Sequence, residues 1–99
     1  MATGADLIWT GTWETNYGKV ELSQVGSSVT GVYVLKQGRI SGQAAGDKLV
    51  GQWAEAPSYA PPNDAGEFEI RMDQSGRSFT GKWWKLETMK EHEWSGRRT

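Results

Sequence analysis

The chain has 99 residues, with 11 lysines and arginines interspersed among 12 aspartates and glutamates, and no cysteine. This length suits one domain, and the charge balance excludes both the basic surface of a typical nucleic-acid-binding protein and an acidic tail. The missing cysteines exclude a disulfide framework, a thiolate metal site and a cysteine nucleophile. Neither a membrane-spanning apolar run nor a signal-peptide pattern occurs, so we expect a soluble protein without membrane insertion, whose compartment stays unspecified.

The elements expected along the chain are all β-strands. Apolar residues alternate with polar ones, as in Val29, Gly31 and Tyr33, and this period of two is typical of strands with one buried face. Pairs such as Gly26-Ser27 and Ser75-Gly76 punctuate these runs as turns. In chain order the expected strands are 7–15, 18–25, 28–36, 38–44, 47–55, 66–74, 77–86 and 91–98.

The second half of the chain repeats the first. SQVGSSVTGVY, from Ser23 to Tyr33, returns as DQSGRSFTGKWW, from Asp73 to Trp84. One half cannot cover its own apolar face, and closing a meander removes its exposed edges. We therefore predict a single all-β domain over residues 1–99, an eight-stranded antiparallel up-and-down meander barrel built from two four-strand repeats, 7–44 and 47–98.

Inward positions are rich in aromatic residues and glycine. Glycines 11, 31, 42, 51, 81 and 96 share the inward parity, and we expect each to leave room over which an indole can lie. The aromatic lining favours a filled barrel, although the glycines return some volume and a cavity for one small ligand stays open as an alternative. The expected inward residues are Leu7, Trp9, Trp13, Val20, Leu22, Val29, Tyr33, Leu35, Ile40, Leu49, Trp53, Phe68, Ile70, Met72, Phe79, Trp83 and Trp94.

Some of these residues resemble a known superfamily. Gly11-Thr12-Trp13 on the first strand, the eight-strand meander and Arg97-Arg98 on the last strand are similar to the calycins, which include lipocalins and avidins. The resemblance implies that Trp13 closes one end of the barrel and that Arg98, or Arg97, packs across it, with Trp9 as the alternative plug. The wording GTW, TGxY or TGxW, and SGxR is also similar to short bacterial barrel proteins of uncharacterised function.

Loop lengths indicate where a ligand would bind. Alternate connections of a meander lie at the same end, so the tight turns gather at one end and the longer loops at the other. Binding residues concentrate on such loops, although the proline-containing loop 56–65 could equally serve as a lid. We expect a small apolar or aromatic ligand at this mouth, and the candidate binding residues are Tyr17, Tyr33, Lys36, Arg39, Trp53, Tyr59, Asn63, Trp83 and His92.

The sequence offers little catalytic chemistry. His92 is the only histidine, and Glu91 and Glu93 would point away from it, so we expect no enzyme, no metal site and no cofactor. Trp84, Val32 and Val34 point outward and could form a patch for a second copy, unless Lys82 lies over it. The alternative function is therefore a protein-interaction or inhibitor module with a solid barrel and no small ligand.

Overall fold

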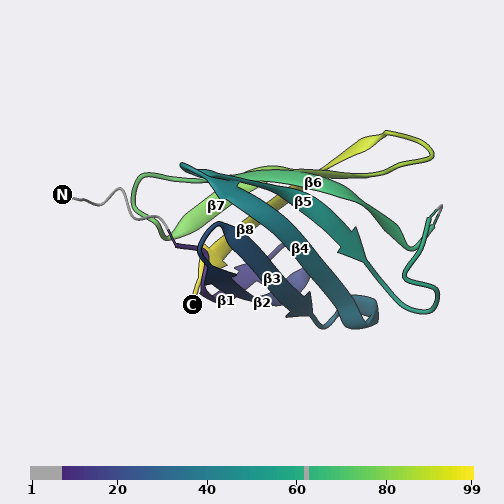
Figure 1. The fold of residues 1–99 in the computed structure, drawn as a ribbon, viewed down its shortest axis with the longest axis horizontal. Coiled ribbons are helices and arrows are strands. Elements are labelled where there is room, and N and C mark those ends of the chain that lie inside the picture. Colours follow the sequence, from purple (N-terminus) through teal and green to yellow (C-terminus); the bar gives the residue numbers. More distant parts are fainter. Residues whose placement is uncertain (1–7, 62) are drawn as a thin grey trace.

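The computed structural model describes residues 8–61 and 63–99 and shows a closed antiparallel barrel with the meander order β1 to β8 (Figure 1). Each strand pairs with the next along the chain, and β8 pairs with β1 to close the ring. The all-β barrel prediction is therefore confirmed. The strands are β1 (Gly11–Thr15), β2 (Gly18–Val25), β3 (Ser28–Tyr33), β4 (Gly38–Ala45), β5 (Lys48–Ala54), β6 (Ala65–Met72), β7 (Ser78–Lys85) and β8 (Glu91–Arg98), with one short 3-10 helix, η1 (Leu35–Gln37).

Most strand ends agree with the predicted ones to within two residues, and the first strand differs most. Leu7, its predicted start and a predicted core residue, lies outside the described residues. The segment before Gly11 is joined to β2 by side chains. The side-chain oxygen Oε1 of Gln24 accepts from the backbone N–H of Trp9 at 2.9 Å, and the Thr10 hydroxyl accepts from the backbone N–H of Gln24 at 2.8 Å. These bonds take the place of a regular strand ladder.

The third strand is shorter than predicted, and Leu35 is not the buried core residue that the pattern predicts. Tyr33 pairs with Gly38 across the hairpin, so the chain must turn within the four residues between them, and η1 forms there. A side chain at Gly38 would meet the Tyr33 ring, so glycine lets these two strands approach closely. Leu35 consequently leaves the strand period and is 43% exposed.

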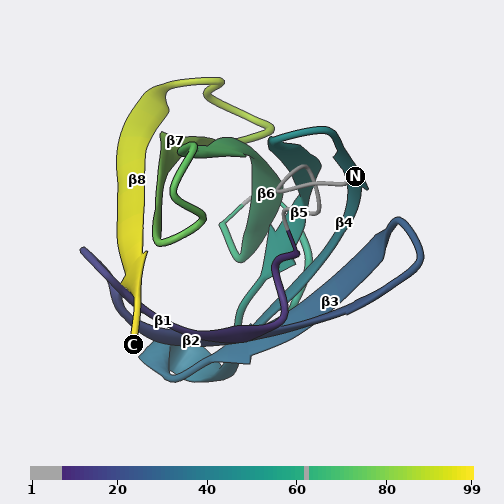
Figure 2. The ribbon, with the colours of Figure 1, turned by 90° about the vertical axis from the view of Figure 1, so that its left-hand side faces the viewer.

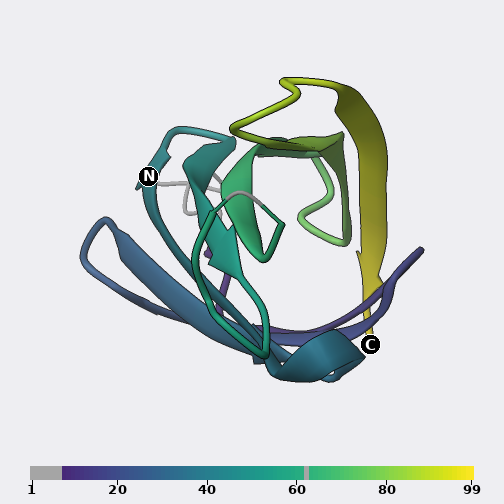
Figure 3. The ribbon, with the colours of Figure 1, turned by 90° about the vertical axis from the view of Figure 1, so that its right-hand side faces the viewer.

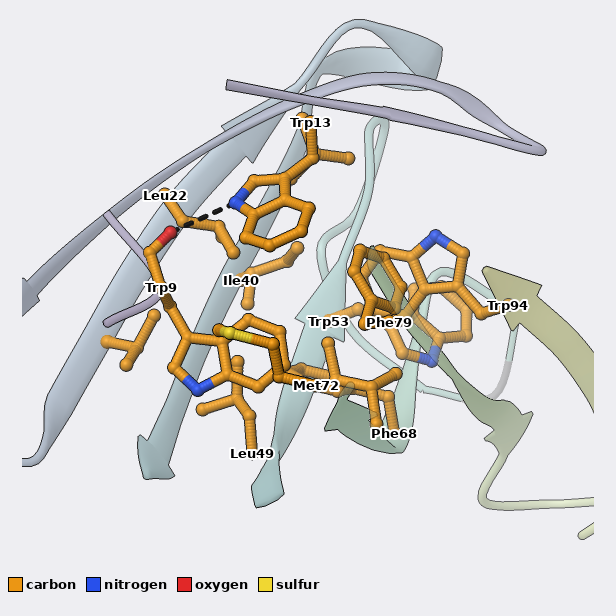
Figure 4. Packing of buried hydrophobic residues seen from close by; sticks show 13 residues of the cluster. Trp9, Trp13, Leu22, Ile40, Leu49, Trp53, Phe68, Met72, Phe79 and Trp94 are labelled. Atoms are coloured by element: carbon orange, nitrogen blue, oxygen red, sulfur yellow. Dashed lines mark hydrogen bonds between the residues drawn. The ribbon is translucent and has the colours of Figure 1, made fainter. Parts of the chain in front are cut away.

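The core fills the end of the barrel that holds the tight turns. Phe79 contacts Trp9 and Trp13 at this end, with ring centroids 5.9 Å and 5.4 Å apart, and on its mouth side it contacts Trp94 at 5.4 Å (Figure 4). Tilted and edge-on rings at such distances add to the energy of apolar burial. The buried hydrophobic residues were all predicted to face inward: Trp9, Trp13, Val20, Leu22, Val29, Ile40, Leu49, Trp53, Phe68, Ile70, Met72, Phe79 and Trp94.

Glycines allow close approach between strands and rings. Gly51 faces Gly42 across β4 and β5, and a side chain at Gly51 would strike the Ser41 carbonyl oxygen. Rings occupy the space beside other glycines, with Trp53 next to Gly66 and Phe79 next to Gly96. The predicted pairing of glycine with indoles is wrong for the six glycines named: Gly96 faces the Phe79 ring, and backbone crowds Gly51, while Gly66 beside Trp53 was not among them.

Arg98 closes the tight-turn end, where the chain enters β1 and leaves β8 (Figures 1 and 2). Its guanidinium carbon lies 4.2 Å from the centroid of the Trp13 ring. The guanidinium also donates to the carbonyl oxygens of Ile8 and Thr10 at 2.7 Å and of Gly76 at 3.0 Å. This is the packing that the resemblance implied, and Arg98 rather than Arg97 provides it.

Closure between β1 and β8 is extended by the side chain of Asn16. The two strands pair at only three positions, which end at Thr15 and Gly96. Beyond them the Asn16 amide group accepts from the Ser95 backbone N–H and donates to the Glu93 carbonyl, both at 3.0 Å.

Among the described residues no helix is long and apolar enough to cross a membrane.

Candidate functional site

The longer connections gather at the end of the barrel opposite Arg98 (Figure 3). The turn at 16–17, the helix η1, the loop 55–64 and the loop 86–90 surround this mouth. The meander places them together because each of these connections follows an odd-numbered strand. The longest connection, 55–64, lies at the mouth as predicted, whereas five residues, 73–77, join β6 to β7 at the other end in place of the two-residue turn expected there.

A cavity of about 210 Å³ opens at the mouth above the filled core. Its wall combines aromatic and apolar side chains with a few polar groups, as small-molecule sites commonly do. The lining residues are Tyr17, Val20, Tyr33, Leu35, Lys36, Trp53, Glu55, Asn63, Trp83, Lys85 and Trp94. The interior is therefore filled at one end and hollow at the other.

Trp83 organises the aromatic part of the wall. The Trp53 ring meets it edge-on at 5.3 Å between centroids, and the Tyr17 ring meets it edge-on at 5.9 Å. Behind it, His92 stacks on the indole at 4.4 Å with an interplanar angle of 22°. The Trp53 Nε1 group donates to the Trp84 carbonyl at 3.3 Å, which orients the Trp53 ring. These contacts hold large flat surfaces around the cavity.

A partly buried phenol and a carboxylate form the main polar contact of the wall. The Tyr33 hydroxyl donates to Glu55 Oε2 at 2.6 Å. Burial raises the pKa of Tyr33 well above its usual value, and the hydrogen bond to Glu55 and the Glu55 charge raise it further. The phenol therefore remains a neutral donor at physiological pH, and one carboxylate oxygen is committed to it.

The structure brings six of the nine candidate binding residues together in the cavity wall: Tyr17, Tyr33, Lys36, Trp53, Asn63 and Trp83. His92 instead stacks on Trp83 without lining the cavity. Arg39 and Tyr59 lie outside the barrel, where the guanidinium carbon is 4.5 Å from the tyrosine ring centroid. These two residues line a separate hollow of about 320 Å³ beside Val32.

Backbone bonds explain why Tyr59 does not cover the mouth. The loop 55–64 closes on itself, because the Glu55 amide donates to the Asp64 carbonyl at 2.7 Å and the Tyr59 amide donates to the Glu55 carbonyl at 2.9 Å. The Tyr59 hydroxyl then donates to the Gln37 carbonyl at 3.1 Å, which holds the ring against the outside of β4. Asn63, by contrast, reaches the cavity.

Five residues of the wall are absent from the predicted binding set: Val20, Leu35, Glu55, Lys85 and Trp94. The strand pattern predicts Val20 and Trp94 as core residues, and it predicts Leu35 deeper in the barrel than it lies. The parity of the strands could have identified the other two, because Glu55 follows Trp53 and Lys85 follows Trp83 at a spacing of two. Both stand where their strands end at the mouth.

The outer face carries a groove of about 450 Å³ that includes Val50 and Trp84. Trp84 is partly buried and donates from Nε1 to Glu67 Oε1 at 3.2 Å. Lys82 forms an ion pair with Glu91 at 3.0 Å.

Within residues 8–61 and 63–99, no three His, Asp or Glu side chains gather closely enough to hold a metal ion.

Comparison of the chain with protein-family models, with curated proteins and with solved structures gives no match.

Proposed function

We propose that this protein is a small binding protein, not an enzyme, which holds a small apolar or aromatic molecule in the mouth cavity. The observation that carries the proposal is the cavity of about 210 Å³ framed by Tyr17, Trp53 and Trp83. Flat aromatic walls favour offset or edge-on contact with an aromatic ligand and exclude water from it. The filled core beneath the cavity provides a rigid floor.

We further propose that the barrel is calycin-like. The support is the end closure, in which Arg98 covers Trp13 and ties the segment before β1 to the β6–β7 connection. A barrel closed at one end and open at the other is suited to taking a ligand through the open end.

The test is a titration of intrinsic tryptophan fluorescence with neutral aromatic, aliphatic and saccharide compounds. Saturable quenching or a spectral shift with an aromatic or apolar compound is the expected result. Trp83→Leu should weaken binding at least fivefold, whereas its sequence neighbour Trp84→Leu, on the outer face, should bind as the unchanged protein does. Silence across the whole panel, or binding that survives Trp83→Leu but not Trp84→Leu, would contradict the proposal.

A second candidate function is association through the outer face. The groove that includes Val50 and Trp84 exposes apolar surface, with Val50 45% exposed. A second copy or another protein would cover that surface, as an interaction or inhibitor module requires. Sedimentation velocity tests self-association: a dimer that dissociates on Trp84→Ser supports it, and a monomer at all accessible concentrations counts against it.

A further inference from the structure

The charged residues that line the mouth cavity are two lysines, Lys36 and Lys85, and one glutamate, Glu55. Asp64 lies close enough for the charges of both lysines to lower its pKa. The ion pairs within residues 8–61 and 63–99 involve Lys48, Arg71 and Lys82, so no carboxylate there lies within 4.0 Å of either cavity lysine.

Glu55 keeps its negative charge, but the Tyr33 hydroxyl holds its Oε2 at 2.6 Å, and among the described residues it forms no ion pair with either lysine. The nearby acid Asp64 is also engaged, since the Ser58 hydroxyl donates to its Oδ2 at 2.7 Å. The pKa of Asp64 is lowered chiefly by that hydrogen bond, and the charges of Lys36 and Lys85 lower it further. The charges of Lys36 and Lys85 thus both reach Asp64, and among the described residues neither lysine forms an ion pair with a carboxylate.

The backbone presents Lys36 in an unusual conformation. Lys36 and Gln37 have φ values of 51° and 53°, in the left-handed region that residues other than glycine rarely adopt. The loop 55–64 holds this turn, because the Ala56 amide donates to the Lys36 carbonyl at 2.9 Å and the Tyr59 hydroxyl donates to the Gln37 carbonyl. Such conformations persist only where their surroundings enforce them, and they cluster at binding sites.

We propose that the ligand of this cavity is an aromatic carboxylate, whose ring lies against Trp53 and Trp83 and whose anionic group is held by Lys36 and Lys85. This inference rests on the proposed function and specifies the class of ligand. Ammonium groups attract a carboxylate as point charges, and the effect is larger beside a low-dielectric aromatic wall than in open water. Asn63 in the same wall offers an additional hydrogen-bond donor.

The experiment compares 2-naphthoate with 2-naphthamide by isothermal titration calorimetry at low ionic strength. The two compounds share their ring system and differ in charge. The naphthoate should bind roughly tenfold more tightly, and Lys36→Gln and Lys85→Gln should each weaken its binding about threefold while leaving the amide unchanged. Lys48→Gln, at the opposite end of the barrel, is the matched control and should change neither affinity.

The outcomes separate the inference from the function on which it rests. If the amide binds as tightly as the naphthoate, or if Lys36→Gln and Lys85→Gln weaken both compounds equally, the anionic preference is wrong and the cavity still binds aromatic molecules. If neither compound binds to the folded protein, the proposed function fails and the inference fails with it. A circular dichroism spectrum and an unfolding curve for each variant confirm that the barrel is intact.

Discussion

Arg98 holds the segment before β1 against the closed end of the barrel, and replacing it with alanine should destabilise the whole protein. The guanidinium donates to the carbonyl oxygens of Ile8 and Thr10 at 2.7 Å and of Gly76 at 3.0 Å, and it covers Trp13 at 4.2 Å. Alanine removes all of these interactions and opens the buried Trp13 ring to water.

The size of the effect follows from the interactions that alanine removes. A hydrogen bond from a charged donor is worth up to a few kcal/mol when buried and less when water competes, as it does for Ile8 and Thr10. The cation over the indole adds about 0.5 to 1 kcal/mol. Arg98→Ala should therefore lower the free energy of unfolding by about 2 to 3 kcal/mol. Arg98→Lys should recover less than half of that difference, because an ammonium group cannot reproduce the planar fork.

Urea unfolding followed by tryptophan fluorescence measures this change in stability, since the indoles report on the core directly. Arg97→Ala is the matched control: the neighbouring side chain is exposed and should change stability by less than about 0.5 kcal/mol. A change below about 0.5 kcal/mol for Arg98→Ala, or full stability in Arg98→Lys, would show that the guanidinium does not hold the closed end together.

Three further predictions concern the seam where β8 pairs with β1, the turn that contains Asp73, and Gly51. Asn16→Ala removes the side-chain bonds to Ser95 and Glu93, so hydrogen exchange at the Ser95 amide should accelerate at least tenfold; unchanged protection would show that the seam closes without them. Hydrogen bonds from Ser75 and Ser78 lower the pKa of Asp73 from 3.8 to about 2, so its stabilising contribution is complete above about pH 4 and is lost as the pH falls toward 2. Carboxyl NMR titration of Ser78→Ala should show the Asp73 pKa moving back toward 3.8, and a value that stays near 2 would contradict the assignment. Gly51→Ala forces a side chain against the Ser41 carbonyl and should lower the free energy of unfolding in urea by about 1 to 3 kcal/mol, whereas Ser41→Ala should lower it by less than about 0.5 kcal/mol. Equal effects would mean that β4 and β5 separate easily.

The alternation of apolar and polar residues identified the fold because each strand has one buried face. In β6, for example, Phe68, Ile70 and Met72 are buried and alternate with polar residues. The pattern failed at Leu35, where the chain must turn to pair Tyr33 with Gly38. Alternation alone does not show where a strand stops, since an apolar residue just beyond the end continues the same pattern. The predicted division into two repeats stays a prediction.

The candidate site was predictable where it lies on strands and less so where it lies in loops. Trp53 and Trp83 line the cavity because their strands fix which face they occupy. Tyr59 and Arg39 were expected at the mouth with them, but the hydrogen bonds of the loop 55–64 turn Tyr59 to the outer face. No local sequence pattern specifies such a loop, because its shape depends on long-range partners such as Gln37. Glu55 and Lys85 could have been found by extending the strand parity to the mouth.

Ligand binding at the mouth can be tested residue by residue in an NMR titration of the indole N–H signals with 2-naphthoate. The six tryptophans sample separate parts of the molecule: Trp9 and Trp13 at the closed end, Trp53, Trp83 and Trp94 at the cavity, and Trp84 on the outer face. Binding in the mouth predicts saturable shifts of Trp53, Trp83 and Trp94, while Trp9 and Trp13 stay unchanged. Shifts confined to Trp84 or to the closed end, or no shifts at all, would contradict a binding site at the mouth.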